Sequence, residues 1–316
     1  MPGHDIVVIG GSAGALTALE LLVSRLPEKF PASLFITIHL GDFSALPQIL
    51  QRRTTLKVSS PRNGEKMRRG NIYVAPIDHH LIPRGECIEV SKGPRENRHR
   101  PSIDVLFRSA ARSFRSRVIG VLLSGALDDG VAGMYSIKAK GGLAVAQDPK
   151  DALVPELPQN VVKAMDMDAV VPAAKIGPLL ADLVLKSNGK ARKPRRAKKK
   201  APETFSVPNE STRPAPFSCP ECSGPMHETN ENGMVQFKCD VGHAYSALEL
   251  TEAHSEALER ALWVTIRTLN ERMRIQEALA KGHGGNGDRK KAERFQENAE
   301  NAARDLALLE EVLRRM

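Results

Sequence analysis

Short apolar runs rich in β-branched residues recur through the first half of the chain and predict buried strands. Four such runs, DIVVI, LFITI, NIYVA and VIGVLLS, occupy residues 5–9, 34–38, 71–75 and 118–124. Helical patterns lie between several of them, for example over residues 15–26 and 105–113. Strands that alternate with helices are typical of a mostly parallel sheet covered on both faces. We therefore predict a doubly wound α/β domain over residues 1–185.

The pattern changes at residue 186, after which large apolar side chains almost disappear until about residue 216. Such a composition cannot bury enough surface to offset the entropy of ordering, so residues 186–216 are predicted to be a disordered linker. The nine Lys and Arg residues between 186 and 200 account for the whole net charge of +9. The positive charge therefore lies in the predicted linker and not in the folded parts of the chain. A solvated spacer is favoured, and a contact with nucleic acid or an anionic membrane is the alternative.

The last part of the chain, residues 246–316, has the pattern of two helices. Ser246 and Glu249 form a capping box at the start of the first helix. Apolar or small residues then mark one face of each helix: Leu258, Leu262, Thr265, Leu269, Met273 and Leu279, then Phe295, Ala299, Ala302, Leu306, Leu309 and Leu313. The segment GHGGNGD at 282–288 separates the two patterns. We therefore predict an antiparallel helical hairpin in which the apolar faces of the two helices pack against each other. A partner-binding or dimer face is the alternative, with Trp263 as the best candidate for an exposed anchor.

Between the linker and the helices lies a cluster of three of the four cysteines. Cys219, Cys222, Cys239 and His243 follow the pattern Cys-x2-Cys, sixteen residues, Cys-x3-His. Three thiolates and one imidazole suit a tetrahedral zinc ion, and four ligands without an obvious fifth predict a closed structural site. Residues 217–245 are thus predicted to be a zinc-ribbon-like unit stabilised largely by its metal. A degenerate ribbon or buried cysteines are the alternative.

The chain has no signal for export or membrane insertion. Its N-terminus lacks a basic region and reaches a Gly-rich turn after one short apolar run. No apolar run approaches the roughly 20 residues that a membrane-spanning helix needs. We predict a cytoplasmic protein.

A candidate nucleophile follows the first predicted strand, which runs directly into the Gly-rich turn GGSAGA at residues 10–15. A strand, such a turn and a helix expose a side chain at the sheet edge beside free N–H groups. Ser12 could attack a carbonyl there, and N–H groups of residues 12–14 could stabilise the oxyanion. Alternatively, Ser12 is only a helix N-cap. The turn lacks both the G-x-G-x-x-G spacing of dinucleotide sites and the Lys-Ser/Thr pair of a P-loop.

Two further strand ends bring polar residues to the same edge. His39 ends the second predicted strand, and the strand at 118–124 is followed by GALDDG. Parallel strands have their carboxyl ends at one edge, so His39 could serve as the base for Ser12. Asp128 or Asp129 could supply the carboxylate that orients the imidazole, and spacing alone does not choose between them.

Several motifs resemble the catalytic domain of the chemotaxis protein-glutamate methylesterases, the CheB family, over about residues 4–185. They are IGGSAGA, YVAP, NRHRPSIDVLF, LSGALDDGVAGM and AQDP at residues 9–15, 73–76, 97–107, 123–134 and 146–149. The resemblance implies that Ser12 is the nucleophile, His39 the base and Asp129 the triad acid. It implies hydrolysis of γ-glutamyl methyl esters on chemoreceptor-type proteins, with methanol released and no catalytic cofactor. It also implies that glutamine deamidation is an alternative activity.

The chain departs from the family pattern in two loops and in its domain organisation. Ala13, beside Gly14 in one loop, and Ala126, in the other, stand where the family has different side chains near the oxyanion and the substrate. The family's usual receiver domain is not seen before the first strand, so we expect no control by an attached receiver. The C-terminal module resembles a small domain found on some methylesterases that lack a receiver, which suggests that a regulatory protein docks on its helices.

The basic segment KGPRENRHR at 92–100 supplies candidate contacts to acidic receptor helices, namely Arg98 and Arg100. Internal ion pairing of these arginines is the alternative. A rival interpretation of the whole chain is an inactive hydrolase fold that acts as a regulatory or nucleic-acid-associated scaffold. That interpretation is disfavoured because the ribbon lacks a basic face interleaved with aromatic residues.

Overall fold

The computed structural model describes residues 3–39, 45–188, 212–231, 234–285 and 289–315. It divides into two compact units, Met1–Leu250 and Thr251–Met316, which are described separately. Among the described residues, no helix is both long enough and apolar enough to cross a membrane.

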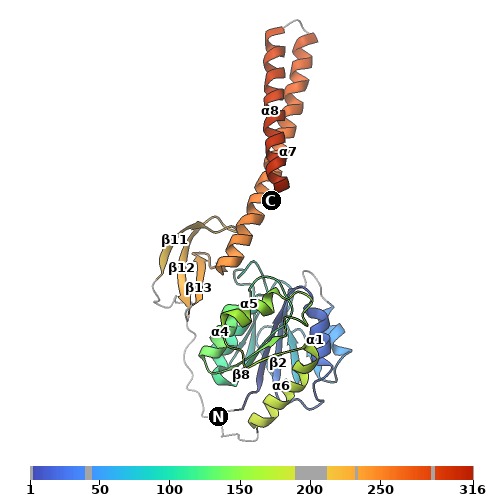
Figure 1. The fold of residues 1–316 in the computed structure, drawn as a ribbon, viewed down its shortest axis with the longest axis vertical. Helices are drawn as coiled ribbons and strands as arrows, with labels where there is room; N and C mark the ends of the chain where they lie inside the picture. Colours follow the sequence, from blue (N-terminus) through green and yellow to red (C-terminus); the bar gives the residue numbers. More distant parts are fainter. Residues whose placement is uncertain (1–2, 40–44, 189–211, 232–233, 286–288, 316) are drawn as a thin grey trace. The chain divides into compact units, whose positions relative to one another are not determined.

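A seven-stranded sheet forms the centre of the first unit (Figure 1). Its strands are β1 (Ile6–Gly11), β2 (Ser33–Ile38), β3 (Lys57–Ser59), β5 (Asn71–Val74), β8 (Val118–Leu122), β9 (Leu143–Gln147) and β10 (Ala169–Val171). Their order is β10-β9-β8-β1-β2-β5-β3, and every neighbouring pair is parallel. The predicted parallel α/β fold is confirmed, and β1 lies between β2 and β8.

Helices cover both faces of this sheet. They are α1 (Ala15–Val23), α2 (Leu46–Gln51), α3 (Ile103–Phe114), α4 (Val131–Ala139), α5 (Glu156–Ala164) and α6 (Ala173–Asn188). Residues of β1 alternate between two apolar cores: Val7 and Ile9 pack with α1, α2 and α6, whereas Ile6 and Val8 pack with α3, α4 and α5. Because both faces are covered, all six residues of β1 are buried, as expected for a central parallel strand.

A small antiparallel sheet, which the sequence did not predict, is formed by one strand that lies between β3 and β5 in the chain and two strands that lie between β5 and α3. It consists of β4 (Glu65–Lys66), β6 (His80–Arg84) and β7 (Cys87–Ser91), in the order β4-β7-β6. Leu81 and Ile88 attach it to the core on the α3 side of the main sheet. Its last strand in the chain, β7, leads directly into residues 92–100.

The zinc-ribbon-like unit is a four-stranded antiparallel sheet. Its strands are β11 (Arg213–Ser218), β12 (Pro225–Glu231), β13 (Met234–Cys239) and β14 (Ala244–Tyr245). Strand β11 begins before residue 216, so the predicted linker ends earlier than expected, because pairing with β12 orders this Pro-containing edge. Residues 189–211, which make up most of that predicted linker, lie outside the described residues.

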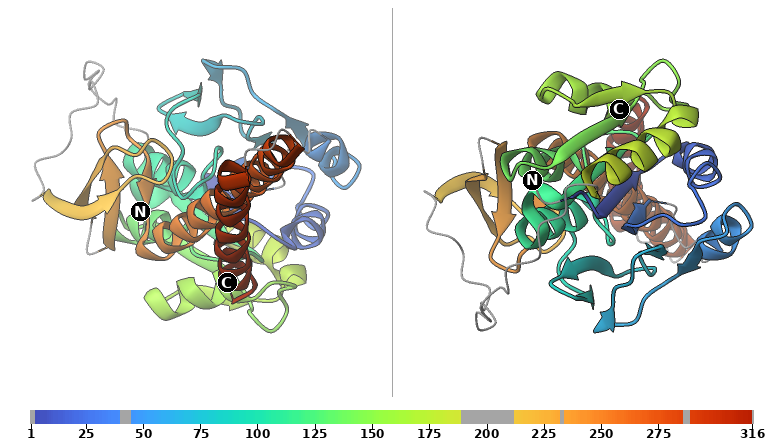
Figure 2. Two further views of the ribbon diagram at one scale, coloured as in Figure 1. Left: turned by 90° about the horizontal axis from the view of Figure 1, so that it is seen from above. Right: turned by 90° about the horizontal axis from the view of Figure 1, so that it is seen from below.

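Two long helices, α7 (Ala247–Gly285) and α8 (Arg289–Arg315), confirm the predicted hairpin and run side by side in Figure 1. Figure 2 shows the ribbon from above and from below, where the two helices overlap. Helix α7 continues through Gly282 to Gly285, so it ends later than the start of the predicted break at 282–288, and residues 286–288 lie outside the described residues. Ala299 and Ala302 of the predicted seam are buried. Leu258, assigned to the same stripe, is instead 52% exposed, close to the 54% of Trp263.

Candidate active site

Ser12 lies at the carboxyl edge of the sheet, in the turn between β1 and α1. It is half-buried, and its backbone N–H donates to the carbonyl oxygen of Ser124 at 2.9 Å. Gly14, with φ of 75°, occupies the N-cap position of α1, and no side chain caps this helix, so the N-cap interpretation of Ser12 is wrong. Since the amide of Ser12 is already bonded, the expected oxyanion donors are reduced to Ala13 and Gly14.

His39 follows the neighbouring strand at the same edge. Gly11 pairs with Ile38 in the parallel register, and the His39 N–H donates to the Gly11 carbonyl at 3.1 Å. Ser12 and His39 are therefore the first residues beyond two adjacent strands. The His39 side chain is 8% exposed, and its ring stacks on that of His99 with centroids 3.6 Å apart. Among the described residues, neither ring nitrogen of His39 has a partner with hydrogen-bond geometry, so the contact of the imidazole with the Ser12 hydroxyl stays a prediction.

The carboxylate beside His39 is that of Asp129. Its Oδ2 lies 3.1 Å from His39 Nε2, whereas the neighbouring Asp128 accepts a hydrogen bond from Ser246 Oγ at 2.7 Å. Burial by itself would raise the pKa of Asp129, but the hydrogen bond and charge of His39 outweigh burial and lower that pKa. Asp129 is thus held as a carboxylate, the form that can orient an imidazole and stabilise its charged state.

Asp129 is fixed from the other side by the N-terminus of α3. Its Oδ2 accepts the N–H of Ile103 at 2.7 Å, and its Oδ1 accepts the N–H of Asp104 at 3.2 Å and the hydroxyl of Ser102 at 2.9 Å. The first N–H groups of a helix have no partner within the helix and carry a partial positive charge. Asp129 therefore caps α3 from a distant part of the chain, which fixes the position of its carboxylate.

A second buried carboxyl group, that of Asp104, lies beside the first. Its Oδ1 accepts the N–H groups of Gly130 and Gly133 at 3.1 and 2.6 Å. Asn97 Nδ2 donates to Asp104 Oδ2 at 2.9 Å and to Asp129 Oδ1 at 2.8 Å. Burial and the nearby charge of Asp129 raise the pKa of Asp104, so the pKa values of the two carboxyl groups move apart.

The loop after β8 lies close to Ser12. A Cβ atom added to Gly125 would stand 3.0 Å from the Ser12 Cβ, so only glycine permits this approach. The next residue, Ala126, is exposed. Its place in the loop beside Ser12 is compatible with the expected oxyanion or substrate role, which stays a prediction.

Sequence reasoning missed three residues of this site, namely Asn97, His99 and Asp104. All three lie in NRHRPSIDVLF, from which only the two arginines were selected. Burial, with the nearby His39 as a further cause, lowers the pKa of His99 to about 3, so the imidazole of His99 is kept neutral. The motif NRHRPSIDVLF could have pointed to these residues, but the spacing of residues along it does not show which side chains face the active site.

The two arginines make ion pairs within the chain. Arg98 Nη1 lies 3.3 Å from Glu249 Oε2, and Arg100 Nη2 lies 2.7 Å from Asp78 Oδ1. Their side chains are 22% and 19% exposed. These contacts favour the internal-pairing alternative, and a role in substrate binding stays a prediction.

The ribbon brings together the four residues of the Cys and His pattern. The Sγ atoms of Cys222 and Cys239 are 3.7 Å apart, and Nδ1 of His243 lies 3.7 Å from Cys219 Sγ and 3.5 Å from Cys239 Sγ. All four ligand atoms lie within 4.8 Å of one another. The cluster could therefore bind a metal ion.

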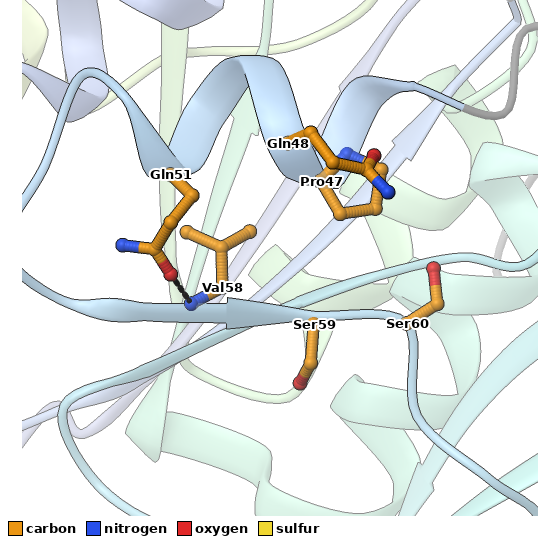
Figure 3. Close-up of a pocket in the computed structure, with 6 residues that line it drawn as sticks. All are labelled: Pro47, Gln48, Gln51, Val58, Ser59 and Ser60. Atoms are coloured by element: carbon orange, nitrogen blue, oxygen red, sulfur yellow. Dashed lines mark hydrogen bonds between the residues drawn. The ribbon is translucent and has the colours of Figure 1, made fainter.

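A pocket outside this constellation lies between α2 and β3 (Figure 3). It is lined by Pro47, Gln48, Gln51, Val58, Ser59 and Ser60. Gln51 Oε1 accepts the N–H of Val58 at 2.9 Å, which ties the two elements together. The lining contains no ionisable side chain, so the pocket is not a candidate for acid–base chemistry.

Comparisons with known proteins match the part of the chain that carries the constellation. A family model described as CheB methylesterase matches residues 7–180. A protein of Leptospira interrogans is 37% identical over 179 residues, which are 56% of this chain and 93% of the relative. The protein-glutamate methylesterase/protein-glutamine glutaminase of Thermotoga maritima is 33% identical over 185 residues, and the chain spans about half (54%) of its length.

A solved structure gives the same result. The crystal structure of the Thermotoga maritima CheB methylesterase catalytic domain superposes with a TM-score of 0.55 at 32% identity. The match covers 58% of this chain and 100% of that chain. The ribbon and the helical hairpin lie beyond the matched family region, which ends at residue 180.

Proposed function

Because the chain belongs to the CheB methylesterase family, we propose that it hydrolyses 5-methyl esters of glutamate side chains on chemoreceptor-type proteins in the cytoplasm. The products are glutamate and methanol. The observation that carries the proposal is His39: its backbone pairs with the end of the Ser12 strand, and its imidazole lies 3.1 Å from Asp129. Nucleophile, base and orienting acid then come from three adjacent parallel strands, β1, β2 and β8.

In the first half of the reaction, Ser12 Oγ attacks the ester carbonyl while His39 takes its proton. The negative charge that develops on the carbonyl oxygen is stabilised by the N–H groups of Ala13 and Gly14, at the start of α1. His39 then gives the proton to the methoxy oxygen, and methanol leaves. An acyl ester of Ser12 remains.

In the second half, a water molecule gives one proton to His39 and attacks the acyl carbonyl. The tetrahedral intermediate collapses, the bond to Ser12 Oγ breaks, and Ser12 regains its proton from His39. The glutamic acid side chain leaves and gives its remaining proton to solvent, which yields the carboxylate. The charged Asp129 stabilises the imidazolium in both halves, and its bonds to α3 keep it from rotating.

Deamidation of receptor glutamines is a second candidate, because the curated name of the Thermotoga maritima relative includes a glutaminase activity. The same acyl-serine would form, with ammonia as the leaving group in place of methanol. Methanol and ammonia release, measured in parallel on methylated and amidated receptors, distinguishes the two activities.

Arg98 provides a test of receptor binding. We expect Arg98→Gln to raise the receptor KM about two- to fivefold with a smaller change in kcat, since a partly exposed charge contributes modestly to binding. Arg84→Gln, which removes an arginine with 63% side-chain exposure on β6, is the matched control. A KM for Arg98→Gln equal to that of the control would leave internal pairing as the only role of Arg98.

We also propose that the ribbon binds zinc. Zn–S and Zn–N bonds of about 2.3 and 2.0 Å in a tetrahedron place two sulfurs ~3.8 Å apart and a sulfur and a nitrogen ~3.5 Å apart. The separations of Cys222 and Cys239, and of Cys239 and His243, are 3.7 and 3.5 Å. The donor set therefore fits a structural zinc ion, which would crosslink the strands of the ribbon.

Metal analysis tests this proposal. We expect about one zinc per chain in protein purified without chelator, and loss of that zinc in Cys239→Ser, because three ligands hold zinc far less tightly than four. Cys87→Ser removes a cysteine on β7 that is not part of the cluster and should keep the zinc. Less than half an equivalent in the wild type would contradict the proposal.

A further inference from the structure

The segment that joins the ribbon to α7 contacts the loop that precedes the triad region. We call residues 242–249 the junction segment; it lies within the first compact unit, Met1–Leu250. The Asn97 N–H donates to the Ala244 carbonyl at 2.7 Å, and the Ala244 N–H donates to the Arg95 carbonyl at 3.4 Å. The Ser246 N–H donates to Asn97 Oδ1 at 3.0 Å. These contacts join segments about 150 residues apart in the chain.

Asn97 links the junction segment to the triad carboxylate. Its Nδ2 donates to Asp129 and Asp104, and its Oδ1 accepts from Ser246. The orientation of the amide is therefore determined from both ends. A flipped amide would place its oxygen against two carboxyl groups and its NH2 against the N–H of Ser246. Since Asn97 is 1% exposed, water could not compensate for those losses.

Ser246 makes a second connection to the loop that carries Asp129. Its Oγ donates to Asp128 Oδ1 at 2.7 Å and accepts the N–H of Glu249 at 3.1 Å. The predicted capping box at the start of α7 is thus formed on the Ser246 side, and the same hydroxyl also bonds the residue next to the triad acid. Through Asn97 and Asp128, the junction segment contacts the surroundings of Asp129 at two points.

Glu249 completes the buried surroundings of this contact. It is 1% exposed, and burial, with the charge of Asp129 as a further cause, raises its pKa to about 9. Arg98 contacts it at 3.3 Å, which places a cation next to the same group.

We propose that the junction segment is a functional part of the active site. Asn97 is a positioning residue that orients the carboxylate of Asp129, and Ser246 holds both Asn97 and the Asp128–Asp129 turn in place. The contact of the junction segment with Asn97 and Asp128 therefore controls the rate at which Ser12 reacts. The inference rests on the proposed function for the role of Ser12 as nucleophile.

The test measures covalent labelling of Ser12 in the full-length protein by a fluorophosphonate probe, with the labelled residue identified by peptide mapping. Asn97→Gly removes the amide but keeps the turn, since glycine adopts the φ of 49° found at Asn97 without strain. We expect the maximal labelling rate to fall about 10- to 100-fold, the effect of losing one hydrogen bond to a charged group. The half-saturating probe concentration should stay unchanged, because Asn97 does not contact the probe.

The contribution of the junction segment is tested at Ser246. Ser246→Ala should lower the maximal labelling rate roughly three- to tenfold by removing one hydrogen bond that supports the site, and Ser246→Thr, which keeps the hydroxyl, should restore it. Ser255→Ala is the matched control. It makes the same substitution on α7 at a hydroxyl that donates to the Thr251 carbonyl within the helix, and it should label at the wild-type rate.

Each outcome decides one question. Slow labelling of Asn97→Gly and Ser246→Ala, with recovery in Ser246→Thr, supports the proposal. Equal rates for Ser246→Ala and Ser255→Ala would overturn the role of the junction segment, and a wild-type rate in Asn97→Gly would overturn that of Asn97. Wild-type protein that does not label at Ser12 would instead contradict the proposed function.

Discussion

Replacing Ser12 with alanine should reduce methanol release from methyl-esterified chemoreceptors on the order of a thousandfold or more. The variant loses the only atom that can form the acyl intermediate, so His39 and Asp129 are left without a nucleophile to activate. The remaining activity would come from oxyanion stabilisation and substrate binding alone. Substrate affinity should change little, because alanine removes a single oxygen from a half-buried position.

The measurement uses membranes that carry methylated receptors and compares wild type, Ser12→Ala and Ser24→Ala. Ser24 is exposed at the end of α1 and its hydroxyl donates to the Leu21 carbonyl of the same helix, so removing this hydroxyl should leave methanol release unchanged. Near wild-type release by Ser12→Ala would rule out Ser12 as the nucleophile. Absence of release from all three proteins would favour an inactive scaffold, or an enzyme that needs an activating partner.

The main elements of the fold could be predicted because their signals are local. Buried parallel strands such as β1 and β8 appear in the sequence as continuous β-branched runs, and the Gly-rich turn at Ser12 marks a strand end. The sheet β4-β7-β6 was missed because its strands are two to five residues long and its pairing depends on contacts with the core. Helix α7 passes through Gly282 although glycine disfavours helix, because the cost of about 1 kcal/mol is small for a helix of 39 residues.

From strand spacing alone the triad could be predicted only as a set of strand ends, and the choice of Asp129 came from the family resemblance. Parallel strands bring Ser12, His39 and an acidic pair to one edge, but the edge rule does not say which carboxylate faces the imidazole. That choice depends on α3, whose N-terminus bonds Asp129. The same dependence on distant elements explains why Asn97 was missed: its partners are 7, 32 and 149 residues away along the chain.

The structure therefore predicts opposite results for two adjacent aspartates. Asp129→Asn should lower kcat about 10⁴-fold, because an amide cannot stabilise the imidazolium of His39 and favours the wrong tautomer. It should also destabilise the fold by about 1–2 kcal/mol at neutral pH, since the carboxylate caps α3. The Asp128 carboxylate accepts a hydrogen bond from Ser246, and Asp128→Asn keeps an oxygen acceptor for that bond, so this variant should retain activity within about threefold.

The two variants are compared by methanol release and by denaturant unfolding at several pH values. The folded-state pKa of Asp129 is lowered, so its carboxylate stabilises the fold above the unfolded pKa of about 3.9, and this stabilisation is lost as the pH falls. The stability difference between wild type and Asp129→Asn should therefore shrink below about pH 4. Equal losses of activity in Asp128→Asn and Asp129→Asn would show that the acidic pair acts through the fold of its loop. A loss confined to Asp129→Asn would show that the carboxylate 3.1 Å from His39 is the one the reaction uses.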